Sequence, residues 1–273
     1  MNKNILELID KFQPQAVHTP IDKCKLEQTL IDLFDSMFPL CTRLDDNLVR
    51  DKLKVSANTL FENIAKLTDE TFANEVVEDF FGNFSNLRNR LFKDAQCYVK
   101  NDPAAKSLEE VIITYPGFFA LAVHRIAHNL HSLGVPLIPR LFSEFAHARV
   151  GIDIHPAAEI GKNFFMDHGT GIVVGETTKI GNNVKIYQGV TLGALYLEKN
   201  LSDVKRHPTV EDNVIIYSNA TILGGETVIG HDSVIGGGAW LTHSVIPYSL
   251  VYNKVDVKVK TVKGFIEPDN YVI

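Results

Sequence analysis

Apolar residues recur every six positions through the second half of the chain, and this period is the strongest constraint on its fold. It is neither the 3.6-residue period of an α-helix nor the two-residue alternation of a simple strand. A six-residue period predicts a parallel β-helix, in which each repeat supplies one short strand and one turn, and the period-six side chain points inward. The residues that carry the period are Ile154, Ile160, Met166 and Ile172, then after a slip of two Val174, Ile180, Ile186 and Leu192, and further on Val210, Ile216, Ile222, Val228, Val234, Trp240 and Ile246.

The first half of the chain has a different pattern, typical of amphipathic helices. One helical face near the N-terminus gathers Leu26, Leu30, Leu33, Phe34 and Met37. A second helix is predicted between Pro116 and Gly134, two residues that suit a helix start and a helix end. Its His124 and His128 have the i, i+4 spacing of metal ligands, but no further ligand is clearly placed, so a structural role is favoured.

These patterns predict an α+β protein organised by halves. Residues 1–150 form an all-helical domain, which we expect to serve oligomerisation and to supply part of a substrate site. Residues 151–260 form a β-helix, interrupted by a polar excursion at 193–208, where function is expected because the regular repeat is broken there. Residues 261–273 are short and acidic and are predicted to form a flexible tail.

Composition excludes several classes of protein. The formal net charge is −6 and no basic stripe is present, which argues against a nucleic-acid partner. No apolar run approaches the roughly 20 residues that span a bilayer, so no membrane association is expected. The three cysteines are far apart and predict a reduced, cytoplasmic protein. The glycine-rich fingerprints of dinucleotide and nucleoside-triphosphate sites are also absent from the sequence.

Several sequence motifs together resemble the serine O-acetyltransferase family of hexapeptide-repeat acyltransferases. They occur in the order typical of that family and cover roughly residues 95–250. The resemblance implies a left-handed β-helix and the transfer of acetyl from acetyl-CoA to L-serine, which begins cysteine biosynthesis. The motifs are NDPAAKS at 101–107, YPGFFALAVHRIAH at 115–128, DIHPAAEIG at 153–161, MDHGTGIVVGET at 166–177 and RHPTV at 206–210.

The resemblance assigns His168 as the catalytic base and Asp153 as its orienting partner. This assignment suits the chemistry, because an alcohol needs a positioned base to lose its proton near neutral pH. A carboxylate on the second ring nitrogen fixes the imidazole tautomer and stabilises the imidazolium. Asp153 and His168 are 15 residues apart, close to one coil of about 18. Contact across neighbouring coils and contact across a subunit interface both remain open.

The resemblance also assigns the groups that hold the zwitterionic substrate. Asp102 and Asp167 bind its ammonium, Arg206 binds its carboxylate through a planar two-pronged contact, and His207 meets the carboxylate or the hydroxyl. His155 precedes a proline in a predicted turn, and its role is left open.

Further expectations concern the co-substrate and partners. In the resembled family, coenzyme A lies in the groove between adjacent β-helices, at positions that match Ala194, Ser218 and Gly236. No metal is expected. The resemblance also implies a homotrimer or a dimer of trimers, feedback inhibition by L-cysteine, and binding of the C-terminal Ile273 to O-acetylserine sulfhydrylase.

Three other functions compete with this one. Another hexapeptide acyltransferase would act on a sugar or antibiotic, but a neutral sugar has no need of Asp102, Asp167 and Arg206. A γ-type carbonic anhydrase has the same fold with three zinc-binding histidines, for which His155, His168 and His207 are candidates. A non-catalytic scaffold would not require the pairing of Asp153 with His168.

Overall fold

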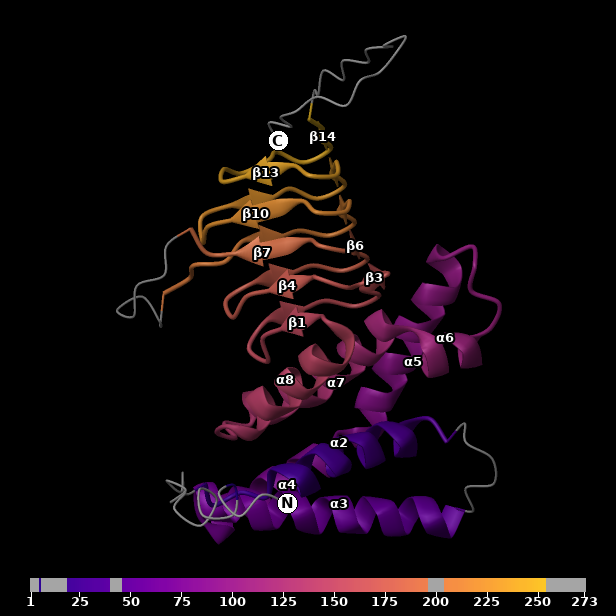
Figure 1. Ribbon diagram of the computed structural model, residues 1–273, viewed down its shortest axis with the longest axis vertical. Helices are drawn as coiled ribbons and strands as arrows, with labels where there is room; N and C mark the ends of the chain where they lie inside the picture. Colours follow the sequence, from indigo (N-terminus) through magenta and orange to yellow (C-terminus); the bar gives the residue numbers. More distant parts are fainter. Residues whose placement is uncertain (1–4, 6–18, 40–45, 196–203, 254–273) are drawn as a thin grey trace.

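A computed structural model describes residues 5, 19–39, 46–195 and 204–253 of the chain. The β-helix forms a tapering column that stands on the helices, with α7 and α8 beneath its first coil (Figure 1). No single helix among the described residues is long and apolar enough to cross a membrane; α6 and α7 pass that test only as a pair, bent by 76°. Two cysteines lie in the described part of the chain, Cys24 and Cys97, and both are free thiols.

The helices begin and end where local chemistry favours it. The side chains of Asp22, Asp69 and Ser107 each accept a hydrogen bond from a backbone N–H in the first turn of a helix. Gly151 ends the last helix in the left-handed conformation (φ 67°), which glycine adopts without strain. The described helices are α2 (Lys23–Met37), α3 (Asp46–Leu67), α4 (Glu70–Gly82), α5 (Phe84–Asn101), α6 (Leu108–Thr114), α7 (Pro116–Ser132) and α8 (Ile138–Val150).

The strands that follow are two or three residues long and all pair in parallel. They stack into three sheets, ordered β1-β4-β7-β10-β13, β2-β5-β8-β11 and β3-β6-β9-β12-β14. Each sheet therefore takes every third strand, as a three-sided parallel β-helix requires. The strands are β1 (Asp153–Ile154), β2 (Glu159–Ile160), β3 (Phe165–Asp167), β4 (Val173–Val174), β5 (Lys179–Ile180), β6 (Lys185–Tyr187), β7 (Thr191–Gly193), β8 (Thr209–Val210), β9 (Ile215–Ile216), β10 (Thr221–Leu223), β11 (Val228–Ile229), β12 (Val234–Ile235), β13 (Trp240–Leu241) and β14 (Leu250–Val251).

The predicted inward positions are confirmed up to Ile222, all of them being buried. Beyond that point the prediction is wrong by one residue: Ile229 and Ile235 are buried, whereas Trp240 is 68% exposed and Ile246 is 78% exposed. The register shifts because one extra residue occupies the turn at Gly224–Gly225. A side chain at Gly225 would overlap the backbone of Lys205, so the returning excursion dictates this turn.

One corner of the column is built from asparagines that sequence periodicity did not single out. Asn163, Asn183, Asn213 and Asp232 all have positive φ, a conformation that asparagine and aspartate tolerate better than most residues. Each asparagine amide donates to the residue one coil above, over distances of 2.9, 3.0 and 3.1 Å. This ladder helps to fix the register of the coils.

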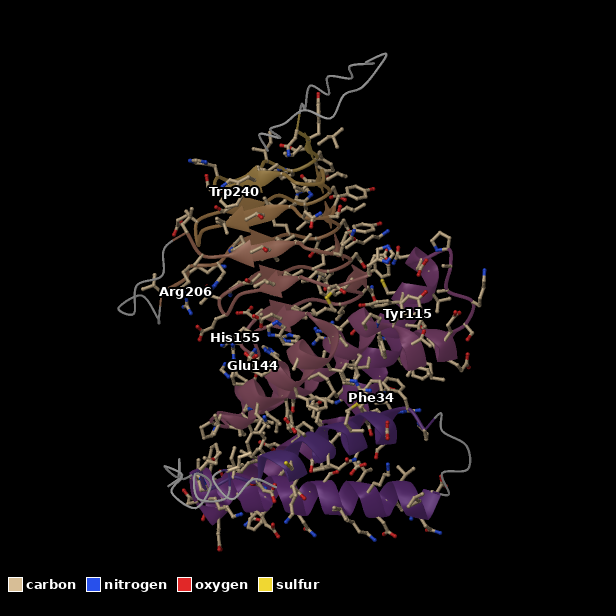
Figure 2. All side chains as sticks on the ribbon, viewed as in Figure 1. Phe34, Tyr115, Glu144, His155, Arg206 and Trp240 are labelled. Carbon is tan, nitrogen blue, oxygen red and sulfur yellow. The ribbon has the colours of Figure 1, made fainter. Side chains whose placement is uncertain are left out.

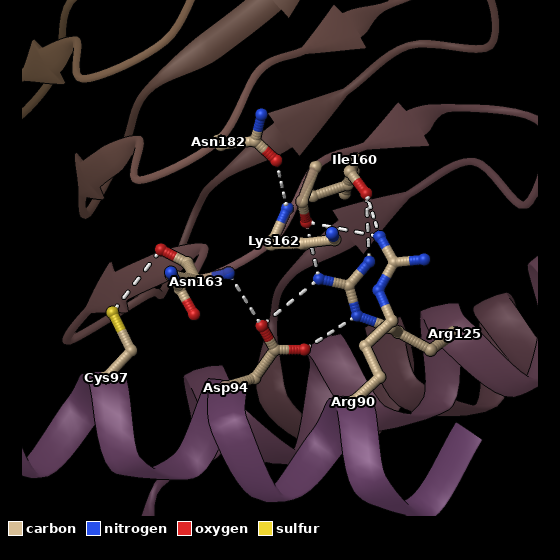
Figure 3. A network of polar contacts seen from close by, with 9 residues as sticks. Arg90, Asp94, Cys97, Arg125, Ile160, Lys162, Asn163 and Asn182 are labelled. Carbon is tan, nitrogen blue, oxygen red and sulfur yellow. Dashed lines mark hydrogen bonds and ion pairs between the residues drawn. The ribbon is translucent and has the colours of Figure 1, made fainter. Parts of the chain in front are cut away.

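A buried ion pair docks the helices on the first coil (Figure 3). Arg125 Nε of α7 donates to Asp94 Oδ2 of α5 at 2.7 Å, and both side chains are almost fully buried. The Arg125 guanidinium also donates to the carbonyl oxygens of Ile160 and Gly161. Arg90 donates to the same two carbonyls. The turn after β2 is therefore held by two arginines from two helices.

We predict that Asp94→Asn lowers the free energy of unfolding by about 3–5 kcal/mol, because it leaves the Arg125 charge buried without its partner. Asp79→Asn on the exposed face of α4 is the matched control and should change stability by no more than about 0.5 kcal/mol. Urea denaturation at equal chain concentration measures both. Equal stability of the two variants would contradict the role given to the ion pair.

Candidate active site

The structure brings together one group of site residues, Asp102, Asp167 and His168, where α5 meets β3. Asp102 follows the last residue of α5, and Asp167 is the last residue of β3. Between them, the buried Tyr98 accepts a hydrogen bond on its hydroxyl from the Met166 N–H at 3.2 Å. This contact fixes the end of α5 against β3 and so sets the spacing of the two carboxylates.

Asp102 is held as a carboxylate. Its Oδ2 accepts a hydrogen bond from the Tyr115 hydroxyl at 2.5 Å, and its Oδ1 accepts one from the Ala104 N–H at 2.8 Å. The bond from Tyr115 is the main reason that the pKa of Asp102 is lowered. The same bond raises the pKa of Tyr115 to about 12. The group therefore offers a negative charge at neutral pH, as an ammonium subsite needs.

His168 lies beside these carboxylates in a turn where the backbone has φ 57°. Its Nδ1 is 3.8 Å from Asp167 Oδ1, and 71% of its side chain is exposed. The turn contains the two extra residues that separate Met166 from Val174, so the expanded coil is what projects this imidazole outward.

A second group gathers around Glu176 at another corner of the column. Arg206 Nη2 forms a close ion pair with Glu176 Oε2. His155 lies near the same carboxylate, and its own Nδ1 accepts from the Ala157 N–H at 3.1 Å. His207 packs on Gly175, where a Cβ would overlap the imidazole ring. This corner therefore combines positive charge with two imidazoles.

The hydrogen bonds of His207 determine its tautomer. Its Nδ1 accepts from the Thr177 N–H at 3.1 Å and from the Thr177 hydroxyl at 2.9 Å. The Thr177 hydroxyl oxygen also accepts hydrogen bonds from the backbone N–H groups of Arg206 and His207. Its own proton is therefore the one donated to the His207 imidazole. The proton of His207 is therefore on Nε2. Burial, with the charges of Arg206 and Lys205, lowers the pKa of His207 to about 4.

Lys205 holds the returning end of the excursion. Its Nζ donates to the carbonyl oxygens of Thr177, at 2.6 Å, and of His207 and Pro208. Burial lowers the pKa of Lys205 to about 8. This side chain positions Arg206 and His207, and sequence reasoning missed it.

Asp153 is not joined to His168 by a hydrogen bond in the described chain. It lies on the outer side of β1, where one oxygen of Asp153 comes within 4.8 Å of ligand atoms of Glu144 and His147. Glu144, His155 and Arg206 lie on one side of the molecule and Tyr115 on the other (Figure 2). The predicted site residues therefore fall into two groups within a single chain.

The three predicted coenzyme A positions are likewise divided. Ser218 and Gly236 occupy adjacent coils at one corner, and the Gly238 N–H donates to the Ser218 carbonyl oxygen at 2.9 Å. Ala194 follows β7, at the opposite end of that strand of the β1-β4-β7-β10-β13 sheet from that corner. Sequence reasoning also missed Tyr115, Glu176 and Thr177 as site residues, although they stand in the YPGFF and VVGET motifs.

Comparison with known proteins identifies the family. No family model matches the chain. The structure of serine acetyltransferase 1 from Entamoeba histolytica, solved with L-cysteine, has 31% identity and a TM-score of 0.77, covering 90% of this chain and 94% of that one. The chain belongs to the serine acetyltransferase family.

Two further serine acetyltransferases support this assignment. The Neisseria gonorrhoeae structure solved with serine has 26% identity and a TM-score of 0.59, covering 88% of this chain and 98% of that chain. A plasmid-encoded serine acetyltransferase of Synechococcus elongatus is 46% identical over 178 residues, covering 63% of this chain and 56% of that protein. The chain spans about half the length of the curated relatives that it matches. The predicted fold class, helices followed by a left-handed β-helix, is confirmed.

We predict that stability depends on His207 at acid pH. Its pKa in the folded protein is about 4, below the ordinary 6.5, so the unfolded chain binds the proton more readily. The free energy of unfolding should therefore fall as the pH is lowered from 6.5 towards 4, and His207→Gln should flatten this loss. Denaturation at pH 7 and pH 5 measures it, and an unchanged slope in the variant would contradict the assignment.

Proposed function

We propose that the protein transfers the acetyl group of acetyl-CoA to the hydroxyl of L-serine, giving O-acetyl-L-serine and CoA. The observation that carries the proposal is the meeting of Asp102, Asp167 and His168 on a chain that covers 94% of a serine acetyltransferase solved with L-cysteine. Two carboxylates beside an outward imidazole suit an ammonium-bearing alcohol. A neutral sugar has no charge for them to bind.

The chemistry that we propose is direct transfer. His168 takes the proton of the serine hydroxyl as the oxygen attacks the thioester carbonyl, which makes a tetrahedral intermediate. The carbon–sulfur bond then breaks, and the imidazolium returns the proton to the CoA sulfur. Acetyl-CoA is the co-substrate, with Ala194, Ser218 and Gly236 as the positions proposed to line its groove.

We propose that the site is completed between two chains of a homotrimer. Asp102, Asp167 and His168 of one chain would bind the ammonium and hydroxyl of serine. Arg206, His207 and Asp153 of the next chain would bind the carboxylate and orient His168. The separation of the two groups within one chain supports this arrangement.

Regulation and partners follow from the same site. L-Cysteine differs from L-serine only by sulfur for oxygen, so the proposed ammonium and carboxylate subsites would accept it as a feedback inhibitor.

The helical residues 1–150 would join two trimers, and the β-helix of 151–260 would carry the chemistry. The tail at 261–273 and its Ile273, proposed to bind O-acetylserine sulfhydrylase, lie outside the described residues. The proposed compartment is the cytoplasm.

A carbonic anhydrase function has less support. His155 and His207 lie near one another beside Glu176, whereas His168 lies with Asp102 and Asp167 in the other group. In the proposed trimer these two groups meet between chains, so their separation within one chain does not distinguish the two functions. The match over 94% of a serine acetyltransferase chain favours the acetyltransferase. Zinc analysis of the purified protein, together with a thiol-release assay using acetyl-CoA and L-serine against a panel of sugars, separates these functions.

We predict that His168→Ala lowers kcat by about 10²–10⁴-fold, because a positioned general base contributes roughly that much. Asp153→Asn should cost less, because the imidazole remains. The control is His243→Ala, which alters an exposed histidine after β13 and should leave kcat unchanged. Thiol release at saturating L-serine gives kcat, and circular dichroism checks the fold. Near-full activity of His168→Ala would rule out its role as the base.

A further inference from the structure

A column of outward residues follows the ends of the strands in the β3-β6-β9-β12-β14 sheet, which climbs one side of the molecule (Figure 1). It begins at Asp167 of β3, which pairs with Tyr187 of β6. The registers of the next strand pairs, continued by one residue, place Tyr217, Gly236 and Tyr252 above them in turn. The residues just before the first four of these are buried, so the column faces outward. Each position of the column is called a rung below.

The two lower tyrosines of the column already form a stack. The ring centroids of Tyr187 and Tyr217 are 5.0 Å apart, and the ring planes differ by only 18°. The centroid distance matches the spacing of about 4.7–4.9 Å between neighbouring strands, so the rings stack along the column. Tyr217 is still 43% exposed, although Tyr187 covers one of its faces. The stack therefore ends on a ring whose upper face is available.

The next rung has no side chain. A Cβ at Gly236 would lie 2.8 Å from the carbonyl oxygen of Val251, so the packing of the backbone requires glycine there. The rung above carries Tyr252, which is 72% exposed. Its backbone is held in place, because Asn253 Nδ2 donates to the carbonyl oxygen of Gly238 at 2.8 Å. Two tyrosines therefore stand above and below one rung without a side chain.

The dimensions of this rung suit one planar ring. Tyr217 and Tyr252 are two strand spacings apart along the column, which is roughly 9–10 Å. A ring placed between them would lie about 5 Å from each, which is the distance at which aromatic rings stack. Ser218 follows Tyr217, and its Oγ lies 3.6 Å from the place of a Cβ on Gly237, so a hydroxyl is available at the edge of the ring. The rung therefore favours an uncharged ring with polar atoms on its edge.

We propose that Tyr217 and Tyr252 hold the adenine ring of the co-substrate between them, and so select CoA thioesters over thioesters that lack the nucleotide. The assignment of the ring to adenine rests on the proposed function, in which acetyl-CoA is the donor. Nucleobases stack readily on aromatic side chains, and adenine is uncharged and has polar edges. Three rungs, or roughly 14 Å, separate Gly236 from Asp167, so the pantetheine arm would run down the column towards His168.

Isothermal titration of adenosine 3′,5′-bisphosphate, the nucleotide half of CoA, into the full chain tests the proposal. We expect saturable binding, which Tyr217→Leu and Tyr252→Leu each weaken by about tenfold because leucine keeps an apolar side chain without the ring. The matched control is Tyr248→Leu, which alters an exposed tyrosine that packs edge-on against His231 outside the column and should leave binding unchanged. This ligand has no acetyl group, so the result stands even if the assay with L-serine fails.

Kinetics with two acetyl donors give a second readout. Tyr217→Leu should raise KM for acetyl-CoA by about tenfold with kcat unchanged, and should leave KM for acetyl-pantetheine as it is, because that donor has no adenine. Equal binding of the bisphosphate by the wild type and all three variants would overturn the proposal. A smaller oligomer for Tyr217→Leu in light scattering, with no binding of the bisphosphate to the wild type, would overturn it too and assign the tyrosines to a contact between chains.

Discussion

The active-site geometry depends on how the helices are docked on the first coil of the β-helix. Arg125 of α7 joins the three parts of this contact, because its guanidinium binds Asp94 of α5 and the carbonyl oxygens of Ile160 and Gly161 after β2. The Tyr98 hydroxyl adds a second contact, to the N–H of Met166 in β3. Together they fix the end of α5 beside the end of β3, and so place Asp102 near Asp167. The β-helix positions Asp167 at the end of β3, whereas Asp102 follows α5 and depends on the docking of the helices.

The chemistry-bearing residues stand where the regular repeat is broken. His168 projects from a turn lengthened by two residues, between Met166 and Val174. Arg206 and His207 return from an excursion that separates Leu192 from Val210 by 18 residues, where six is usual. A regular coil must pair its backbone with the coils above and below, which leaves little freedom to place an outward side chain. The insertions supply that freedom, and Lys205 and Thr177 then fix the returning chain.

The fold was largely predictable from the sequence, because a period of six and a period of 3.6 have few structural solutions. The error in register after Ile222 shows the limit. Val228, Val234 and Trp240 are apolar and keep the period, yet the inward residues are their neighbours Ile229 and Ile235, since one extra residue sits at Gly224–Gly225. Pairs of adjacent apolar residues give no sign of which one faces inward. The packing of Lys205 against this turn is a long-range contact that periodicity does not report.

The site was predictable in its residue types and less so in its geometry. The family's motifs identified five site residues, Asp102, Asp167, His168, Arg206 and His207. Their division between two sides of one chain follows from the threefold winding of the coil and the docking of the helices. Supporting residues such as Tyr115 and Thr177 act through hydrogen bonds, which spacing alone does not reveal. Whether Asp153 meets His168 across a coil or across a subunit was left open by the sequence, and the described chain has no hydrogen bond between them.

The central claim is that each active site combines the two groups from different chains. The most direct measurement is activity of hybrid oligomers, made by co-expressing differently tagged His168→Ala and Arg206→Ala chains and purifying those that carry both tags. An intact site forms wherever an Arg206→Ala chain supplies His168 and its His168→Ala neighbour supplies Arg206. Every trimer that carries both tags has one such site out of three, so the purified hybrids should show up to about a third of wild-type activity. Hybrids no more active than the mean of the two parent variants would contradict a shared site.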